Sequence, residues 1–207
     1  IALDTVPGNP TLLQPRLLVG RGMRFLSAAV LAQKAKQFDD GLYAAVELAS
    51  ERGLGQFVSK RELIAALGGR LPPGTEGDAA EVLFSAARLG GVATDPPPPL
   101  RDAVDQRLVA FLDDSARSKP LGFYTWSTDL RAVFQQDRML QTPLVDAASI
   151  RALAEASRAD ARTARAYDAM VSLASRLTNP LTRSDLRAVT TASPTPMPPA
   201  TSTRAAR

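Results

Sequence analysis

The chain has 207 residues, of which 45% are apolar and only 5% aromatic, and it contains neither cysteine nor histidine. This length and apolar content predict a globular core, and the shortage of aromatic residues favours helices over strands. A disulfide, a thiolate nucleophile, a zinc site with Cys or His ligands and a Ser-His-Asp triad are all excluded. The remaining chemistry is that of carboxylates, Lys, Tyr, Ser or oxygen-ligated metals, and we expect no cofactor and no metal.

The formal net charge of +4 arises after residue 99, and Arg204 and Arg207 near the end supply half of it. The folded part is therefore close to neutral, which argues against nucleic acid as a partner. The most apolar stretch, residues 23–32, is too short to span a bilayer. The chain begins with Ile1 rather than Met. We therefore expect it to be a piece of a longer protein.

The first part of the chain predicts an extended lead-in followed by helices. Proline and glycine interrupt residues 1–22 too often for a regular element. Residues 23–37 are apolar nearly all round at first and polar at the end, which is typical of a central buried helix. Residues 39–41 (Asp-Asp-Gly) predict a turn or a cap after it. A second helical stripe starts at Leu42 and ends at Gly53.

Capping signals and prolines organise the middle of the chain. Ser59 and Glu62 form a capping box that predicts a third, short helix, and residues 78–89 predict a fourth helix that two glycines end. Four consecutive prolines, residues 96–99, predict a stiff polyproline connector. The predicted helical halves on its two sides are residues 23–95 and 100–189.

The second half predicts at least four more helices. The first of them has an amphipathic stripe of five residues, Leu100, Val104, Leu108, Phe111 and Leu112. Ser127 is suited to cap the next helix. Residues 147–177 contain no helix breaker, and we expect two packed helices or one kinked helix with the break near residues 157–160. Thr182 and Asp185 resemble a cap for a last short helix, and residues 190–207 predict a linker or disordered tail.

The first candidate site is the aromatic loop, residues 121–127, which contains Phe123, Tyr124 and the single tryptophan, Trp126. Aromatic side chains on a Gly-containing loop before a helix can bind a sugar or a peptide. The alternative is that Trp126 anchors the packing between helices. A ligand site predicts a partly exposed Trp126, whereas a packing anchor predicts a buried one.

The second candidate is Asp137, which falls on the expected inner face of its helix with Leu130 and Phe134. A carboxylate in that position must be partnered or functional. A buried ion pair with a neighbouring arginine or with a residue of another helix is one possibility, and a general acid or base is the other. Asp129, Arg131 and Arg138 are expected polar neighbours of the aromatic loop and Asp137.

The third candidate is a row of arginines on one side of a helix, which could bind phosphate or carboxylate groups. The alternative is a solvated helix face in which the arginines pair with Glu155. The row consists of Arg151, Arg158, Arg162 and Arg165.

These patterns predict an all-α protein that forms an irregular bundle of about eight helices. The function that they favour is that of a helical binding module of a larger bacterial-type protein. Its partner would be another protein, the rest of the parent chain, or a carbohydrate or peptide ligand at the aromatic loop. The alternatives are a hydrolase domain for carbohydrate or peptide that uses Asp137, and a purely structural segment. The Thr-, Ser- and Pro-rich composition of residues 190–207 slightly favours export.

Overall fold

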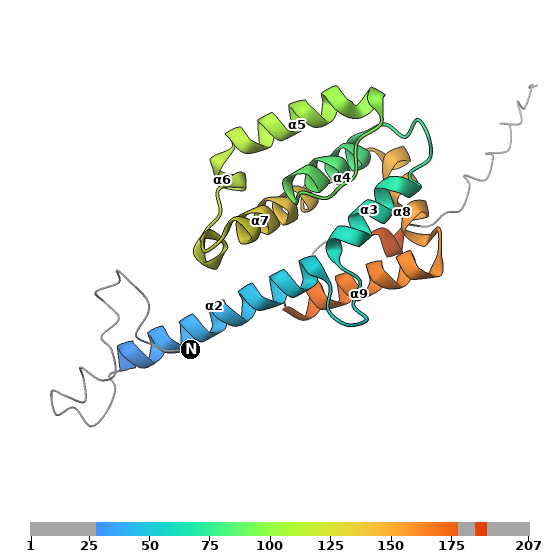
Figure 1. The fold of residues 1–207 in the computed structure, drawn as a ribbon. Coiled ribbons are helices and arrows are strands. Elements are labelled where there is room, and N and C mark those ends of the chain that lie inside the picture. The colour runs from blue at the N-terminus through green and yellow to red at the C-terminus, as the bar shows by residue number, and fades with distance from the viewer. Residues whose placement is uncertain (1–27, 178–184, 190–207) are drawn as a thin grey trace, which may run out of the picture.

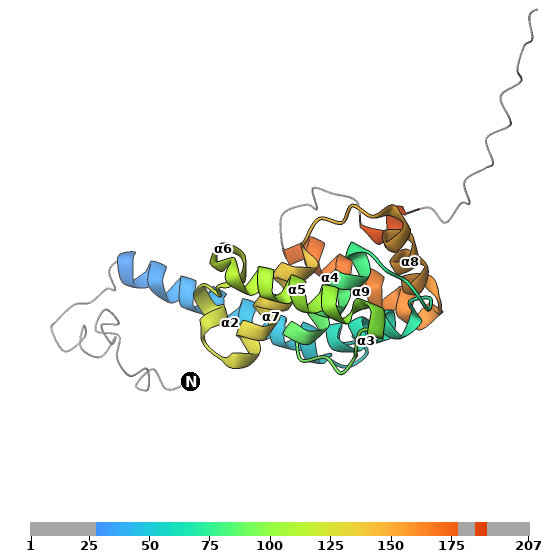
Figure 2. The same cartoon turned by 90° about the horizontal axis from the view of Figure 1, so that it is seen from above.

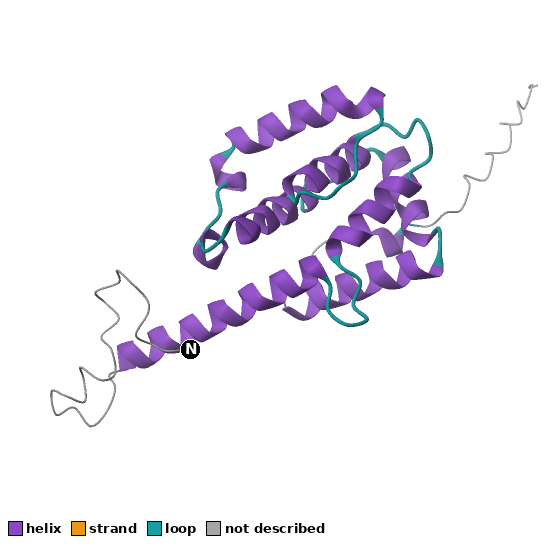
Figure 3. Cartoon of the chain, in the orientation of Figure 1, coloured by secondary structure: helices purple, strands orange, loops and turns teal. Residues whose placement is uncertain are grey.

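The computed structural model describes residues 28–177 and 185–189, and this part of the chain is all-α, as predicted (Figure 3). It contains eight α-helices and three short 3-10 helices, with no strand among the described residues. In chain order these are α2 (Ala28–Arg52), α3 (Lys60–Arg70), α4 (Asp78–Leu89), η1 (Pro98–Leu100), α5 (Arg101–Asp113), α6 (Ser115–Ser118), η2 (Gly122–Thr125), α7 (Thr128–Leu140), α8 (Ala147–Arg158), α9 (Ala161–Leu177) and η3 (Leu186–Ala188). The predictions for residues 1–22 and 190–207 and for Thr182 lie outside the described residues.

The central helix of the bundle is α4, which packs against α3, α5, α7 and α8 (Figure 1). All residues from Val82 to Ala87 are buried, including Ser85. Several of them are small, so neighbouring helices can approach on more than one side. Its bounds are as predicted, and Gly90 ends it.

A close approach between α4 and α7 depends on Gly90. Gln136 of α7 is fully buried, and its Nε2 donates to the backbone carbonyl of Ala86 at 3.4 Å. A Cβ atom at Gly90 would lie only 1.8 Å from that Nε2. Glycine is therefore required at this position for Gln136 to keep its place.

The structure corrects the prediction for residues 23–52. The expected turn at residues 39–41 is absent, because α2 continues through it as one helix of 25 residues. Lys36 Nζ pairs with the carboxylate of Asp40 one turn later at 2.7 Å, which offsets part of the cost of about 1 kcal/mol that Gly41 imposes within a helix. The expectation of a central buried helix is also wrong for residues 28–40, none of which is buried.

The polyproline connector is not confirmed. Pro97 is extended, but Pro98 and Pro99 belong to η1, which leads directly into α5. Proline suits the first turn of a helix, where its missing N–H has no partner to lose. Helix α4 from before the prolines packs against α5 and α7 from after them. The division of the chain at this point stays a prediction.

Three local predictions are confirmed. The hydroxyls of Ser59 and Ser127 accept hydrogen bonds from backbone N–H groups of the first turns of α3 and α7. The break within residues 147–177 lies between α8 and α9, where the Asp160 carboxylate caps α9 by accepting from the Arg162 and Thr163 N–H groups. These bonds hold the pKa of Asp160 at about 2. The predicted cap at Asp185 begins only a 3-10 turn, η3.

Candidate functional site

The aromatic loop lies beside α2 and forms a group of stacked rings. The Phe123 ring lies 6.5 Å from the Tyr43 ring of α2 and 4.2 Å from the Tyr124 ring, measured between centroids. The Trp126 ring meets Phe123 edge-on at 6.3 Å. Trp126 is 57% exposed, so it is not the buried packing anchor that was the alternative. Its exposure meets the first condition for a ligand site.

Asp137 belongs to a different group, a cluster of charges beneath the loop. Its Oδ1 lies 2.6 Å from Lys60 Nζ, and Glu51 Oε2 lies 3.4 Å from the same nitrogen. Glu51 and Lys60 are both almost fully buried. Glu47, one turn before Glu51, accepts a hydrogen bond from the Tyr124 hydroxyl at 3.0 Å. Lys60 thus lies near three carboxylates, those of Glu47, Glu51 and Asp137.

Burial and the surplus of negative charge shift the pKa values within this cluster. Burial, then repulsion from Asp137, raises the pKa of Glu47, and burial also raises the pKa of Glu51. Burial alone would lower the pKa of Lys60, but Asp137 and the two glutamates outweigh it and the pKa is raised. Burial and the neighbouring Glu47 raise the pKa of Tyr124. Asp137 therefore forms a partly buried ion pair, with Lys60 of another helix as its partner.

The other polar residues expected around the aromatic loop point in separate directions. Asp129 pairs with Arg52 at the end of α2. Arg131 Nη2 donates to the Thr125 carbonyl at 3.3 Å, which closes the loop onto α7. Arg138 contacts the Arg117 carbonyl of α6 instead. Of these polar residues, the structure therefore joins only Arg131 to the aromatic loop, whereas Asp129 and Arg138 bond to other elements. Asp137 lies in the charge cluster, where it contributes to the raised pKa of Tyr124.

The arginine row is divided by the break between α8 and α9. Arg151 is exposed on α8. Arg158 Nη2 donates to the backbone carbonyls of Leu186 and Arg187 in η3 and of Val189 just after it, at 2.7 to 3.2 Å. Only Arg162 and Arg165, on α9, remain together. The four residues do not form one anion clamp along a single helix.

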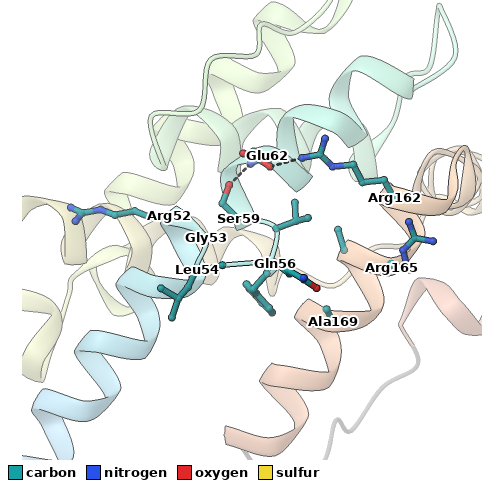
Figure 4. Close-up of a pocket in the computed structure, with 13 residues that line it drawn as sticks. Arg52, Gly53, Leu54, Gln56, Ser59, Glu62, Arg162, Arg165 and Ala169 are labelled. Atoms are coloured by element: carbon teal, nitrogen blue, oxygen red, sulfur yellow. Dashed lines mark hydrogen bonds and ion pairs between the residues drawn. The ribbon is translucent and has the colours of Figure 1, made fainter.

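Arg162 and Arg165 line an open groove of about 910 Å³ between α9 and the turn that follows α2 (Figure 4). In Figure 4 the Arg162 side chain reaches toward Glu62 of α3, with which it pairs at 3.2 Å. The turn is closed by hydrogen bonds between the backbones of Leu54 and Phe57, and Gly55 has a φ of 60° that favours glycine. The groove is open, and of these two arginines only Arg162 forms an ion pair with a described residue.

Among the described residues, the largest run of exposed apolar side chains lies on α2. This surface was not predicted from the sequence. We call it the α2 seam: Ala28, Leu31, Ala35, Phe38, Leu42 and Ala45, all of them exposed. The spacing alternates between three and four residues, which is the heptad pattern of helices that pair with another helix. By helical periodicity, the seam lies on the side of α2 roughly opposite Glu47 and Glu51, which face the bundle.

The first half of α2 extends beyond the other helices in two perpendicular views (Figures 1 and 2). Phe38 is 77% exposed, the highest value for any aromatic residue described. Lys34 and Asp39 flank the seam at the heptad positions next to it, and no described residue forms an ion pair with either. The heptad spacing in residues 28–45 is the signal that could have revealed this surface.

Comparisons with known proteins give no relative: no family model, no curated protein and no solved structure matches the chain. Within residues 28–177 and 185–189, acidic side chains do not gather in a group of three or more that could hold a metal ion. No helix in this part of the chain is long and apolar enough to cross a membrane.

Proposed function

We propose that the protein is a helical interaction module that pairs with a second copy of itself through the α2 seam. The observation that carries the proposal is the exposed heptad pattern, because six apolar residues in register on a protruding helix face have no partner among the described helices. Covering large apolar side chains such as Leu31, Phe38 and Leu42 is worth roughly 25 cal/mol per Å² removed from water. An amphipathic helix is the partner that such a stripe fits.

Charge complementarity favours a second copy in parallel orientation. Lys34 occupies the g position of the seam and Asp39 occupies the following e position. In a parallel pair of helices in register, these two positions of opposite chains lie side by side, and their charges set the orientation. Two copies would therefore form two symmetric Lys34–Asp39 pairs. The alanines at positions 28, 35 and 45 allow the helices to approach closely.

The aromatic loop is a second surface of the same module. Leu121 and Trp126 are exposed beside α2 and could bind a peptide or a carbohydrate, as the sequence suggested. A hydrolase is less well supported, because the Asp137 carboxylate is held by Lys60. A purely structural segment is disfavoured by the exposure of Trp126.

Sedimentation velocity of wild type and variants over a range of concentrations tests the proposal. Wild type should form a dimer, and Phe38→Lys should abolish it. Val109→Lys is the matched control, because Val109 is 60% exposed on α5, outside the seam. A monomeric wild type at all concentrations contradicts self-pairing, and an effect of Val109→Lys equal to that of Phe38→Lys contradicts the seam.

A charge exchange tests the register. Each flanking ion pair is worth about 0.5 kcal/mol, so Lys34→Glu removes about 1 kcal/mol and adds repulsion, which should weaken the dimer about tenfold. Lys34→Glu combined with Asp39→Lys should restore wild-type affinity. An additive loss in the double variant contradicts the parallel pairing.

A further inference from the structure

Between the helices lies an apolar cavity of about 230 Å³ that is partly open to solvent and separate from the α2 seam and the aromatic loop. Five helices and η3 contribute to its wall. Among the lining residues are Leu63, Ile64 and Leu67 of α3, Leu153 of α8 and Met170 of α9. Of the described residues that line it, only Lys60 and Tyr167 have a polar side chain.

The size and lining of this cavity point to an occupant. Protein interiors are close-packed, and an apolar void destabilises the fold in proportion to its volume. Water does not fill such a void well, because it finds too few hydrogen-bonding partners; an engineered apolar cavity of about 150 Å³ stays dry and binds benzene. The cavity described here is larger than that. We propose that it is a binding site for a small uncharged apolar molecule, such as an aromatic ring or a short hydrocarbon chain.

The charges at one end of the cavity select against an anionic ligand. Lys60 already donates to Asp137 at 2.6 Å, with Glu51 and Glu47 close by. A ligand carboxylate would add a fourth negative group to a buried cluster that has one cation. The hydroxyl of Tyr167, at the other polar point of the wall, accepts a hydrogen bond from the Leu186 N–H at 3.2 Å.

Two lining residues indicate where a ligand enters. Leu140, at the end of α7, is 37% exposed and marks where the cavity approaches the surface. Leu186 belongs to η3, which Arg158 holds by donating to the carbonyls of Leu186, Arg187 and Val189. Ala79, in contrast, is fully buried in the wall formed by α4. Larger side chains would therefore obstruct the cavity at its exposed part in the case of Leu140 and at its buried wall in the case of Ala79.

Titration of the full chain with toluene and with benzoate, followed by calorimetry, tests the proposal. The two probes have nearly the same shape and differ in charge. Toluene should bind saturably with one site per chain, and benzoate should bind at least tenfold more weakly. Absence of saturable toluene binding, or equal binding of the two probes, would overturn the proposal. This comparison uses the wild-type chain, so it holds even if a variant fails to fold.

Variants then locate the site. Leu140→Trp and Ala79→Leu should each weaken toluene binding at least tenfold. Val109→Trp is the matched control on the exposed surface of α5 and should change the affinity less than twofold. Toluene binding that is unchanged in both cavity variants places the site elsewhere and refutes the assignment.

Discussion

Replacing Lys60 by methionine should destabilise the fold by about 3 to 5 kcal/mol, which is the cost of removing one partner from a buried ion pair. Lys60 is only 6% exposed and lies within 2.6 Å of Asp137 and 3.4 Å of Glu51. Methionine keeps the apolar part of the side chain, so the variant removes the charge and little packing. It leaves Glu47, Glu51 and Asp137 together without a cation.

The free energy of unfolding that is lost in Lys60→Met should be smaller at lower pH. The pKa values of Glu47 and Glu51 are already raised in the folded state, and without Lys60 they rise further. Between the unfolded and folded pKa values the native state binds more protons than the unfolded state, so the free energy of unfolding falls as pH rises. Lys60→Met should therefore regain part of its stability as the pH is lowered from 7 toward 5.

Urea unfolding followed by circular dichroism at 222 nm, at several pH values, measures both effects. Lys36→Met is the control, because Lys36 forms an exposed ion pair with Asp40 and should cost only about 0.5 kcal/mol. A loss in Lys60→Met as small as that of the control, or a loss that does not diminish at lower pH, would refute the account of the cluster.

Three other outcomes follow from the packing and the exposures. Gly90→Ala should cost about 1 to 3 kcal/mol in urea unfolding, because the new Cβ displaces the buried amide of Gln136; the cost should shrink in a Gln136→Ala background. Ser59→Ala removes the cap of α3 and should cost about 1 kcal/mol by the same assay, whereas a cost near zero would show that the cap is dispensable. Trp126 should emit at long wavelength and be quenched by acrylamide, and protection by a peptide or glycan would support a ligand at the aromatic loop; a blue-shifted, unquenched signal would contradict its exposure.

The parts of the fold that could be predicted follow from local sequence patterns, such as helix caps and the glycines that end helices. The cap residues Ser59 and Ser127 mark the starts of their helices because their hydroxyls satisfy N–H groups of the first turn, wherever the helix packs. The bounds of α4 follow from its apolar pattern and from the glycines after it. The prediction of a turn at residues 39–41 is wrong because one glycine and two aspartates lower helix propensity by only a modest amount, and the Lys36–Asp40 pair offsets part of that cost.

Local sequence patterns could not predict the parts of the site that depend on contacts between distant residues. The sequence placed Asp137 on an inner face, but it could not identify Lys60, 77 residues away, as its partner. The apolar pattern at the start of α2 is visible in the sequence, but it predicts a core helix. A stripe that faces a partner protein has the same periodicity as one that faces the protein's own interior. Only the arrangement of the other helices shows that Phe38 is exposed.

Disulfide cross-linking tests the pairing of α2 most directly, because the chain has no cysteine and a single substitution introduces the only thiol. Ala35 lies within the α2 seam, and Ala29 lies on the same helix outside it; both are exposed. In a parallel dimer in register, the two copies of residue 35 face each other. Ala35→Cys should form a disulfide-linked dimer on mild oxidation and Ala29→Cys should not, whereas equal cross-linking of the two variants, or none in Ala35→Cys, would contradict the proposed interaction.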